Sequence, residues 1–294
     1  MITKYLADMM TKSGQSPVFE TPEHYGLQYQ DVTFSTLDGV ELSGWLIEGG
    51  SDKVIIQSHF GVQCSRAGYT PDGKGMIKLY KKNIPFLRQA KHLVEQGYSV
   101  LMYDLRNHGN SGKGVSEYIA WGCEESHDVV AAVEYITTHP TYKNSDIGLL
   151  SICMGTSSTA FAYGLGHGLQ SYPNIKALIS VQPLRYLDYM SAMGIPDFLT
   201  KRVNKYNMKR GGADLSGSFF EFVPNIKIPT LVIQNKNDPW TKLTAVNEYY
   251  QLLGGDKEMM MLDLDKNRAA AYDWMGEYPQ HLSDYFNKHM PSVS

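Results

Sequence analysis

The sequence has no long hydrophobic run, and this lack excludes a class of proteins at the outset. No apolar stretch reaches the roughly 18 residues that a membrane-spanning helix needs. The first ten residues also lack the apolar segment and the small-residue cleavage site of a secretory signal. We therefore expect a cytoplasmic protein with no membrane partner.

Cysteine is also scarce, which argues against disulfide and zinc frameworks. Cys64, Cys123 and Cys153 are the three cysteines in 294 residues, and none of them lies in a CxxC pair. Asp263 and Asp265 are paired carboxylates, but no histidine or cysteine cluster accompanies them. The glycine pairs lack the context of a phosphate-binding loop. We expect neither a metal nor another cofactor.

There is little excess charge of either sign. The formal net charge of −3 gives no basic excess of the kind that a dedicated nucleic-acid surface needs. The expected partner is therefore a small-molecule substrate. The stretch Ile2–Lys12 has apolar residues at helical spacing and can pack on its own domain or on a second subunit. The sequence is therefore compatible with a homodimer.

Short apolar runs alternate with helical patterns along most of the chain. This alternation predicts an α/β protein with a mostly parallel, twisted sheet and helices on both of its faces. Residues 30–48 are predicted to form a hairpin, and helices are predicted at about 85–96 and 124–138. The predicted core strands are 53–57, 98–103, 147–150, 177–181, 230–233 and 258–262.

The alternation of strand and helix patterns is interrupted within one segment of the main predicted domain. Residues 1–29 are expected to form a helical extension, and 30–294 a single domain of ordinary size. Within that domain, about 183–227 lacks strand alternation and is predicted to be a lid over the carboxyl ends of the strands, where pockets of open α/β sheets form. The alternative is a surface excursion packed on the sheet.

The strongest local signal is Leu149–Ser157, Leu-Leu-Ser-Ile-Cys-Met-Gly-Thr-Ser. An apolar strand ends there, one residue stands on a sharp turn, and a helix starts at once. The residue on the turn is Cys153, and the partial positive charge of a helix start favours a reactive thiolate. The alternative is a buried structural cysteine, because free cysteines are often buried.

Over about residues 30–290 the chain resembles the α/β-hydrolase superfamily. Its nucleophile elbow, G-x-S-x-G, corresponds here to Ser151-Ile-Cys-Met-Gly155, with cysteine in the serine position. The loop Asp104–Gly112 is similar to the D-x-R-x-x-G-x-S loop of these proteins. Gln57–Val62 resembles the oxyanion loop of dienelactone hydrolases. The resemblance implies the α/β-hydrolase fold with a small lid insertion.

The same resemblance implies roles for individual residues. Cys153 would be the nucleophile, and the backbone N–H groups of Met154 and Phe60 would bind the oxyanion. Asp238, after the strand 230–233, matches the acidic member of the triad. The alternative for Asp238 is an ordinary helix cap.

The triad histidine is missing from its expected loop. Residues 262–272 contain no histidine, and Asn267 or Lys266 most nearly occupies its place. Asparagine cannot accept and return a proton near neutral pH, so the usual serine–histidine–aspartate cycle cannot run. His59 in the oxyanion loop is a candidate substitute base; the alternative is a hydrogen-bonded loop histidine.

These residues favour an acyl-transfer enzyme with an atypical triad. We expect it to hydrolyse an ester, lactone or thioester of a small apolar molecule, because a thiolate needs less help from a base than a serine hydroxyl does. The alternative is a non-hydrolytic protein, either a biosynthetic cyclase or lyase or a small-molecule-binding relic. A third reading is an inactive protein, by nature or because one position was engineered.

Overall fold

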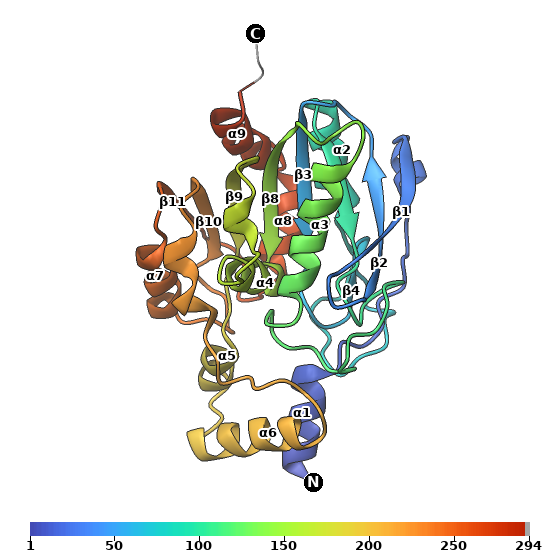
Figure 1. Ribbon diagram of the computed structural model, residues 1–294. Helices are drawn as coiled ribbons and strands as arrows, with labels where there is room; N and C mark the ends of the chain where they lie inside the picture. The colour runs from blue at the N-terminus through green and yellow to red at the C-terminus, as the bar shows by residue number, and fades with distance from the viewer. Residues whose placement is uncertain (292–294) are drawn as a thin grey trace.

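The computed structural model describes residues 1–291, and an eight-stranded sheet forms its centre (Figure 1). The strand order is β1-β2-β7-β3-β8-β9-β10-β11. β1 and β2 form an antiparallel hairpin, β2 pairs antiparallel with β7, and the other neighbours are parallel. The strands of this sheet are β1 Tyr29–Ser35, β2 Glu41–Ile47, β3 Lys53–Ser58, β7 Ser99–Tyr103, β8 Asp146–Ile152, β9 Ile175–Val181, β10 Thr230–Asn235 and β11 Lys257–Leu262.

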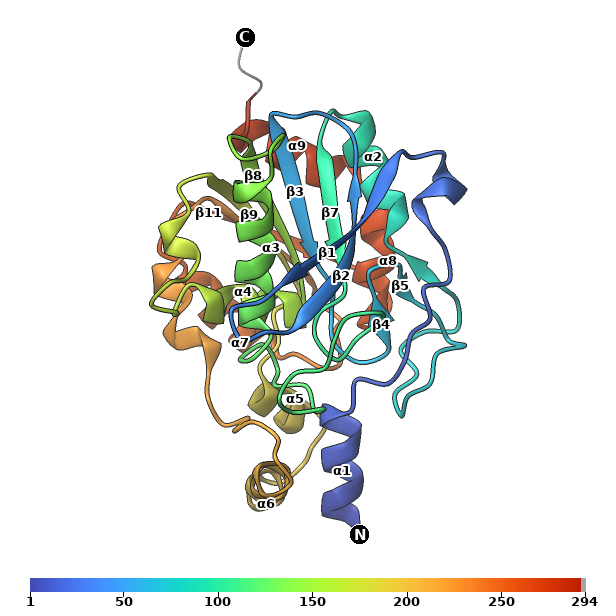
Figure 2. The same ribbon diagram turned by 45° about the vertical axis from the view of Figure 1, so that its right-hand side comes forward.

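Helices cover both faces of the sheet, as the alternating pattern predicts (Figure 2). One apolar cluster holds residues of α3, α4 and α7 against the sheet, and a second holds residues of α2, α8 and α9 against the other face. The α-helices are α1 Ile2–Thr11, α2 Leu87–Glu95, α3 Ser126–Thr138, α4 Met154–Ala162, α5 Tyr186–Ala192, α6 Asp197–Lys209, α7 Leu243–Leu252, α8 Ala269–Glu277 and α9 Gln280–His289. Short 3₁₀ turns are η1 Pro22–Tyr25, η2 Leu169–Ser171, η3 Phe219–Glu221 and η4 Val223–Asn225.

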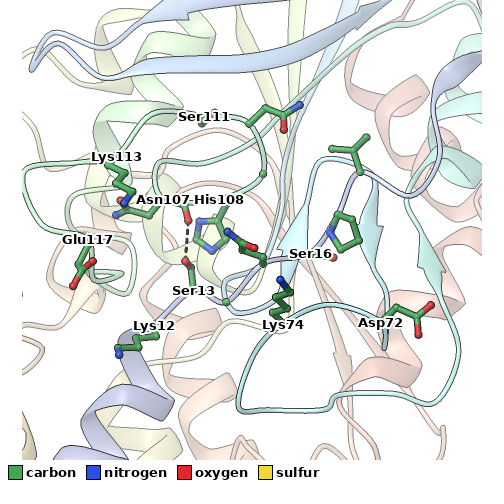
Figure 3. Close-up of a pocket in the computed structure, with 16 residues that line it drawn as sticks. Lys12, Ser13, Ser16, Asp72, Lys74, Asn107, His108, Ser111, Lys113 and Glu117 are labelled. Carbon is green, nitrogen blue, oxygen red and sulfur yellow. Dashed lines mark hydrogen bonds between the residues drawn. The ribbon is translucent and has the colours of Figure 1, made fainter.

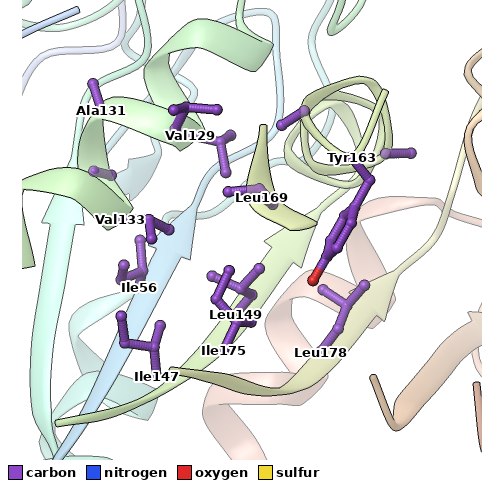
Figure 4. Packing of buried hydrophobic residues seen from close by; sticks show 14 of the residues in the cluster. Ile56, Val129, Ala131, Val133, Ile147, Leu149, Tyr163, Leu169, Ile175 and Leu178 are labelled. Atoms are coloured by element: carbon purple, nitrogen blue, oxygen red, sulfur yellow. The ribbon is translucent and has the colours of Figure 1, made fainter. Parts of the chain in front are cut away.

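The central strands are buried and mostly apolar because both of their faces are covered. Figure 4 shows the side of α3, where Val129 and Val133 belong to the same buried cluster as Ile56 of β3 and Leu149 of β8. Burying each such side chain contributes roughly 1.5–3 kcal/mol. This packing fixes β3 and β8 side by side, and the candidate nucleophile follows β8 directly.

A small second sheet was not predicted. It is antiparallel, in the order β4-β5-β6, with β4 Cys64–Ser65, β5 Gly68–Tyr69 and β6 Ile84–Pro85. Because Pro85 pairs with β5, the helix expected over 85–96 begins at Leu87 instead. Strands of two residues carry no periodicity that a sequence pattern can reveal.

The segment 183–227, the predicted lid region, contains helices α5 and α6 and the turns η3 and η4, and the N-terminal helix α1 packs against α6. Arg210 after α6 forms an ion pair with Asp8 of α1, and the Trp121 ring N–H donates to the carbonyl of Met10 at 2.9 Å. Helix α1 is therefore integrated with the lid region, at the end of the molecule opposite the C-terminus (Figure 1). Within residues 1–291, no helix has the length and apolar character needed to cross a bilayer.

Candidate active site

Cys153 stands on the sharp bend between β8 and α4. Its backbone has φ 52° and ψ −102°, a conformation that side-chain-bearing residues rarely adopt and that costs on the order of 1–3 kcal/mol. Three hydrogen bonds hold it there: its N–H donates to the carbonyl of Val181 at 2.8 Å, and its carbonyl accepts from the N–H groups of Thr156 at 2.9 Å and Ser157 at 3.2 Å. Such strain persists where the surroundings over-determine it, typically at functional sites.

Small residues let the elbow approach the neighbouring strand. A Cβ atom on Gly155 would lie 2.4 Å from the carbonyl oxygen of Ser58 at the end of β3, so only glycine fits there. Ser151, where the family motif has its first glycine, is buried, and its hydroxyl is 2.8 Å from the hydroxyl of Thr159 in α4. The serine thus links strand to helix without blocking the turn.

The two expected oxyanion donors come from segments that touch each other. Met154 opens α4, so its N–H belongs to the first turn of the helix, where amides lack intrahelical acceptors. The loop containing Phe60 packs on this residue, since a Cβ on Gly61 would lie 2.9 Å from the sulfur of Met154. The N–H of Phe60 interacts with the thiol of Cys64, whose pKa burial raises well above its ordinary value.

Asp238 lies after β10, and its carboxylate is fully buried. One oxygen accepts the backbone N–H of Trp240 at 3.0 Å within a turn, while the N-cap residue of α7 is Lys242, so Asp238 is not a helix cap. The other oxygen forms an ion pair with Arg268, whose side chain is 1% exposed. Asp238 therefore both stabilises the turn and binds Arg268.

Arg268 occupies the place between carboxylate and nucleophile that a triad histidine would fill. Besides Asp238, its guanidinium donates to the carbonyl of Gln182 at 2.6 Å and to the hydroxyl of Thr241 at 3.1 Å. Its Nε has no hydrogen-bond partner. Burial lowers the pKa of Arg268, but the charges of Asp238 and the Cys153 sulfur raise it, and the net pKa lies above the ordinary value. Arg268 is thus a permanent cation beside the sulfur.

Tyr272 of α8 completes the surroundings of the sulfur. Its ring stacks on Phe60 with centroids 4.6 Å apart, and its buried hydroxyl has no nitrogen or oxygen partner but interacts with the sulfur of Cys153. Burial, chiefly, raises the pKa of Tyr272 well above its ordinary value; Arg268 opposes this shift, while the Cys153 sulfur adds to it. The hydroxyl keeps its proton at neutral pH and can donate it.

Asn267 does not take the place of the missing histidine. Its side-chain oxygen accepts the N–H of Ala269 at 2.8 Å, and its amide donates to the carbonyl of Leu79 at 3.4 Å. The next residue, Arg268, lies between Asp238 and the sulfur instead. The sequence pattern does not single out Arg268, because the group expected in this loop is one that can accept a proton, which an arginine cannot do.

His59 is also turned away from Cys153. Its Nε2 accepts the backbone N–H of Leu105 at 3.0 Å, which assigns the proton to Nδ1, 2.7 Å from the carbonyl oxygen of Phe60. Burial lowers the pKa of His59 to about 4. Both ring nitrogens are engaged with the backbone, so His59 has no free nitrogen with which to accept a proton from the sulfur.

The surroundings of Cys153 include the predicted lid region. Cys153 is half-buried and packs against the lid's apolar cluster, which includes Trp121 and Trp240. A polar cavity of about 770 Å³ lies elsewhere, where Ser13 donates a hydrogen bond to the carbonyl of Asn107 at 2.8 Å (Figure 3). No group of three or more histidine, cysteine, aspartate or glutamate side chains within residues 1–291 is arranged to hold a metal ion.

Comparisons with known proteins agree with this architecture. A family model described as the alpha/beta hydrolase fold matches residues 79–216. The esterase Pf2001 of Pyrococcus furiosus is 25% identical, with a TM-score of 0.69 over 96% of this chain and 98% of its own. A dienelactone hydrolase of Anabaena variabilis is 16% identical, with a TM-score of 0.56 over 90% of this chain and 99% of its own. The α/β hydrolase GrgF of a Penicillium species is 19% identical, with a TM-score of 0.65 over 90% of this chain and 100% of its own. A search of curated proteins finds no match. Together with the strand order and the elbow, these likenesses show that the chain has the α/β-hydrolase fold.

Proposed function

We propose that this chain is an acyl-transfer enzyme that hydrolyses an ester, lactone or thioester of a small apolar molecule, with Cys153 as its nucleophile. The observation that carries the proposal is the buried ion pair of Asp238 and Arg268 beside the sulfur at the elbow. The likeness to an esterase and to a dienelactone hydrolase supports the reaction class.

Attack on the substrate needs no general base if the sulfur is already anionic. Arg268 places a permanent positive charge near the sulfur, and the start of α4 adds the partial positive charge of a helix end. A thiolate attacks the carbonyl carbon, and the carbonyl oxygen becomes an oxyanion. The N–H of Met154 and that of Phe60, released from Cys64, would bind this oxyanion.

The leaving group needs a proton, and Tyr272 is placed to give it. When the tetrahedral intermediate collapses, the carbon–oxygen bond breaks and the departing alkoxide takes the phenolic proton, leaving a thioester on Cys153 and a tyrosinate beside Arg268. In the second half, water attacks the thioester and the tyrosinate takes the proton of that water. The acid leaves, and both the thiolate and the neutral phenol are restored.

A second candidate is the non-hydrolytic pocket, either a cyclase or lyase or a binding relic. The fixed charge of Arg268 favours it, because a guanidinium cannot relay protons as an imidazole does. In that case an ester adduct would not turn over, while an apolar ligand would bind saturably beneath the lid.

The test is mass spectrometry of the protein after exposure to p-nitrophenyl acetate, with release of p-nitrophenol followed in parallel. We expect one acetyl group on Cys153 and slow turnover. Both should be lost in Cys153→Ala and kept in Cys123→Ala, the matched control at an exposed cysteine. An unmodified Cys153 together with equal turnover by Cys153→Ala would contradict the proposal. A stable adduct without turnover would favour the second candidate.

A further inference from the structure

Helix α6 presents an unusual face to solvent on the outside of the lid. Successive residues of an α-helix are about 100° apart, so six exposed positions fall within an arc of about 120°. The opposite side holds the buried residues Thr200, Val203 and Asn207, on the side that packs within the lid region. The six residues of this outer face are Phe198, Lys201, Arg202, Lys205, Met208 and Lys209.

The four cations of the outer face are not neutralised by the protein itself. The ion pairs between α6 and α1 run through Arg210 and Asp8 instead. Within the described residues, none of the four takes part in an ion pair. Asp197 is the only acidic residue in the sequence of α6. The whole chain carries a net charge of −3, whereas the outer face of this helix is positively charged.

Large apolar side chains lie among these charges. Phe198 is 72% exposed and Met208 is 48% exposed. Exposed apolar side chains beside a row of cations are the composition of helices that lie in the plane of a lipid interface. A purely electrostatic partner would leave Phe198 and Met208 without a contact.

We propose that the outer face of α6 docks the protein on an anionic lipid surface, with the lid toward the lipid. A second copy of the chain fits less well, since it would bring four like charges against each other. The sequence predicts no membrane partner because no segment is apolar enough to span a bilayer. The contact proposed here is peripheral and needs no such segment. The inference does not rest on the acyl-transfer chemistry at Cys153.

The experiment is sedimentation of the full chain with vesicles of phosphatidylcholine, with and without phosphatidylserine. We expect binding to the anionic vesicles that weakens as salt is added. Each cation near such a surface is worth about a fivefold change in binding, so Lys201→Glu with Lys205→Glu should weaken it by about tenfold or more. The matched control is Lys143→Glu, an exposed lysine just before β8 at the other end of the sheet.

Further measurements separate lipid from other partners. Phe198→Ser should lose vesicle binding while it keeps any binding to heparin, a soluble polyanion. Circular dichroism of each variant checks that it is folded. Equal sedimentation with neutral vesicles, equal loss in Lys143→Glu, or binding to heparin alone would each overturn the proposal, the last by assigning the charges to a soluble acidic partner.

Discussion

At the scale of single residues, Arg268 shares two properties of a triad histidine and lacks the third. It binds the buried carboxylate of Asp238, and it lies beside the sulfur of Cys153. It cannot give up its proton, because its pKa stays above an already high value. Proton transfer must therefore pass through another group, and Tyr272, whose hydroxyl interacts with the sulfur, is the neighbour that carries a proton.

The first prediction concerns the identity of residue 268. Arg268→His should raise the steady-state hydrolysis of p-nitrophenyl acetate, because an imidazole between Asp238 and Cys153 can activate water for deacylation. The gain in hydrolysis rate should appear as pH rises through about 6.5, the ordinary pKa of histidine. The wild type should show no such step in its pH profile. The matched control is Asn267→His, one residue away and directed elsewhere. An equal gain in both variants would count against the assignment of Arg268.

The second prediction concerns the hydroxyl of Tyr272. Tyr272→Phe keeps the ring that stacks on Phe60 and removes a hydroxyl that interacts only with the Cys153 site and has no nitrogen or oxygen hydrogen-bond partner, so the melting temperature should change little. Turnover of an alkyl ester should fall by about 100-fold or more, as for the loss of a general acid. Acetylation by p-nitrophenyl acetate should persist, because p-nitrophenolate leaves without a proton. Equal loss for both kinds of ester would point to a structural role.

Some residues of the candidate site could be predicted from the sequence, and others could not. Cys153 and Asp238 could be found because the order of strands fixes their chain positions, and the structure brings both to one site. Arg268 and Tyr272 could not be found, because their proximity to the sulfur depends on how α8 packs beneath the oxyanion loop. The only sequence signal was an arginine within the loop that lacks histidine.

At the scale of elements, the elbow depends on close contact between the start of α4 and the end of β3. The alternation of apolar runs predicts both elements, and their bounds agree with the sequence pattern within a few residues. The contact of α1 with α6 could not be predicted, because a short amphipathic helix does not specify the surface that it covers. The apolar spacing of Ile2–Lys12 fits equally well on a second subunit.

The third prediction tests this close contact. Gly155→Ala places a Cβ about 2.4 Å from the carbonyl oxygen of Ser58, so backbone must move. Overpacking of this kind typically costs about 1–3 kcal/mol, which should appear as a lower free energy of unfolding in urea. Gly166→Ala is the matched control, because its Cβ would meet nothing within 4 Å. Equal stability of the two variants would contradict the close approach of α4 and β3.

At the scale of the whole molecule, buried arginines join segments that lie far apart in the sequence. Arg106, in the loop after β7, pairs with Asp38 in the turn of the β1–β2 hairpin and with Asp128 in α3. Such networks fix the edge of the sheet to the helical layer. The D-x-R-x-x-G-x-S resemblance located Arg106 but did not identify its partners, since both come from distant segments.

The fourth prediction follows from this network. Arg106 holds the pKa of Asp38 well below its ordinary value, so the unfolded chain binds this proton more readily than the folded protein does. The stabilisation is complete above about pH 3.9, the ordinary pKa of aspartate, and is lost as pH falls further. The difference in unfolding free energy between wild type and Asp38→Asn should therefore shrink in acid. Asp31→Asn, at an exposed position of β1, should show no such change.

The central claim is that Cys153 is the activated nucleophile, and competitive alkylation tests it within one molecule. Treatment with limiting iodoacetamide near neutral pH, followed by peptide mass spectrometry, compares Cys153 with Cys123. Cys123 is more exposed, but burial of its thiol and the nearby Glu125 and Glu124 raise its pKa, which keeps it protonated. We expect faster labelling of Cys153 despite its lower exposure. Preferential labelling of Cys123, with Cys153 unmodified, would contradict the account.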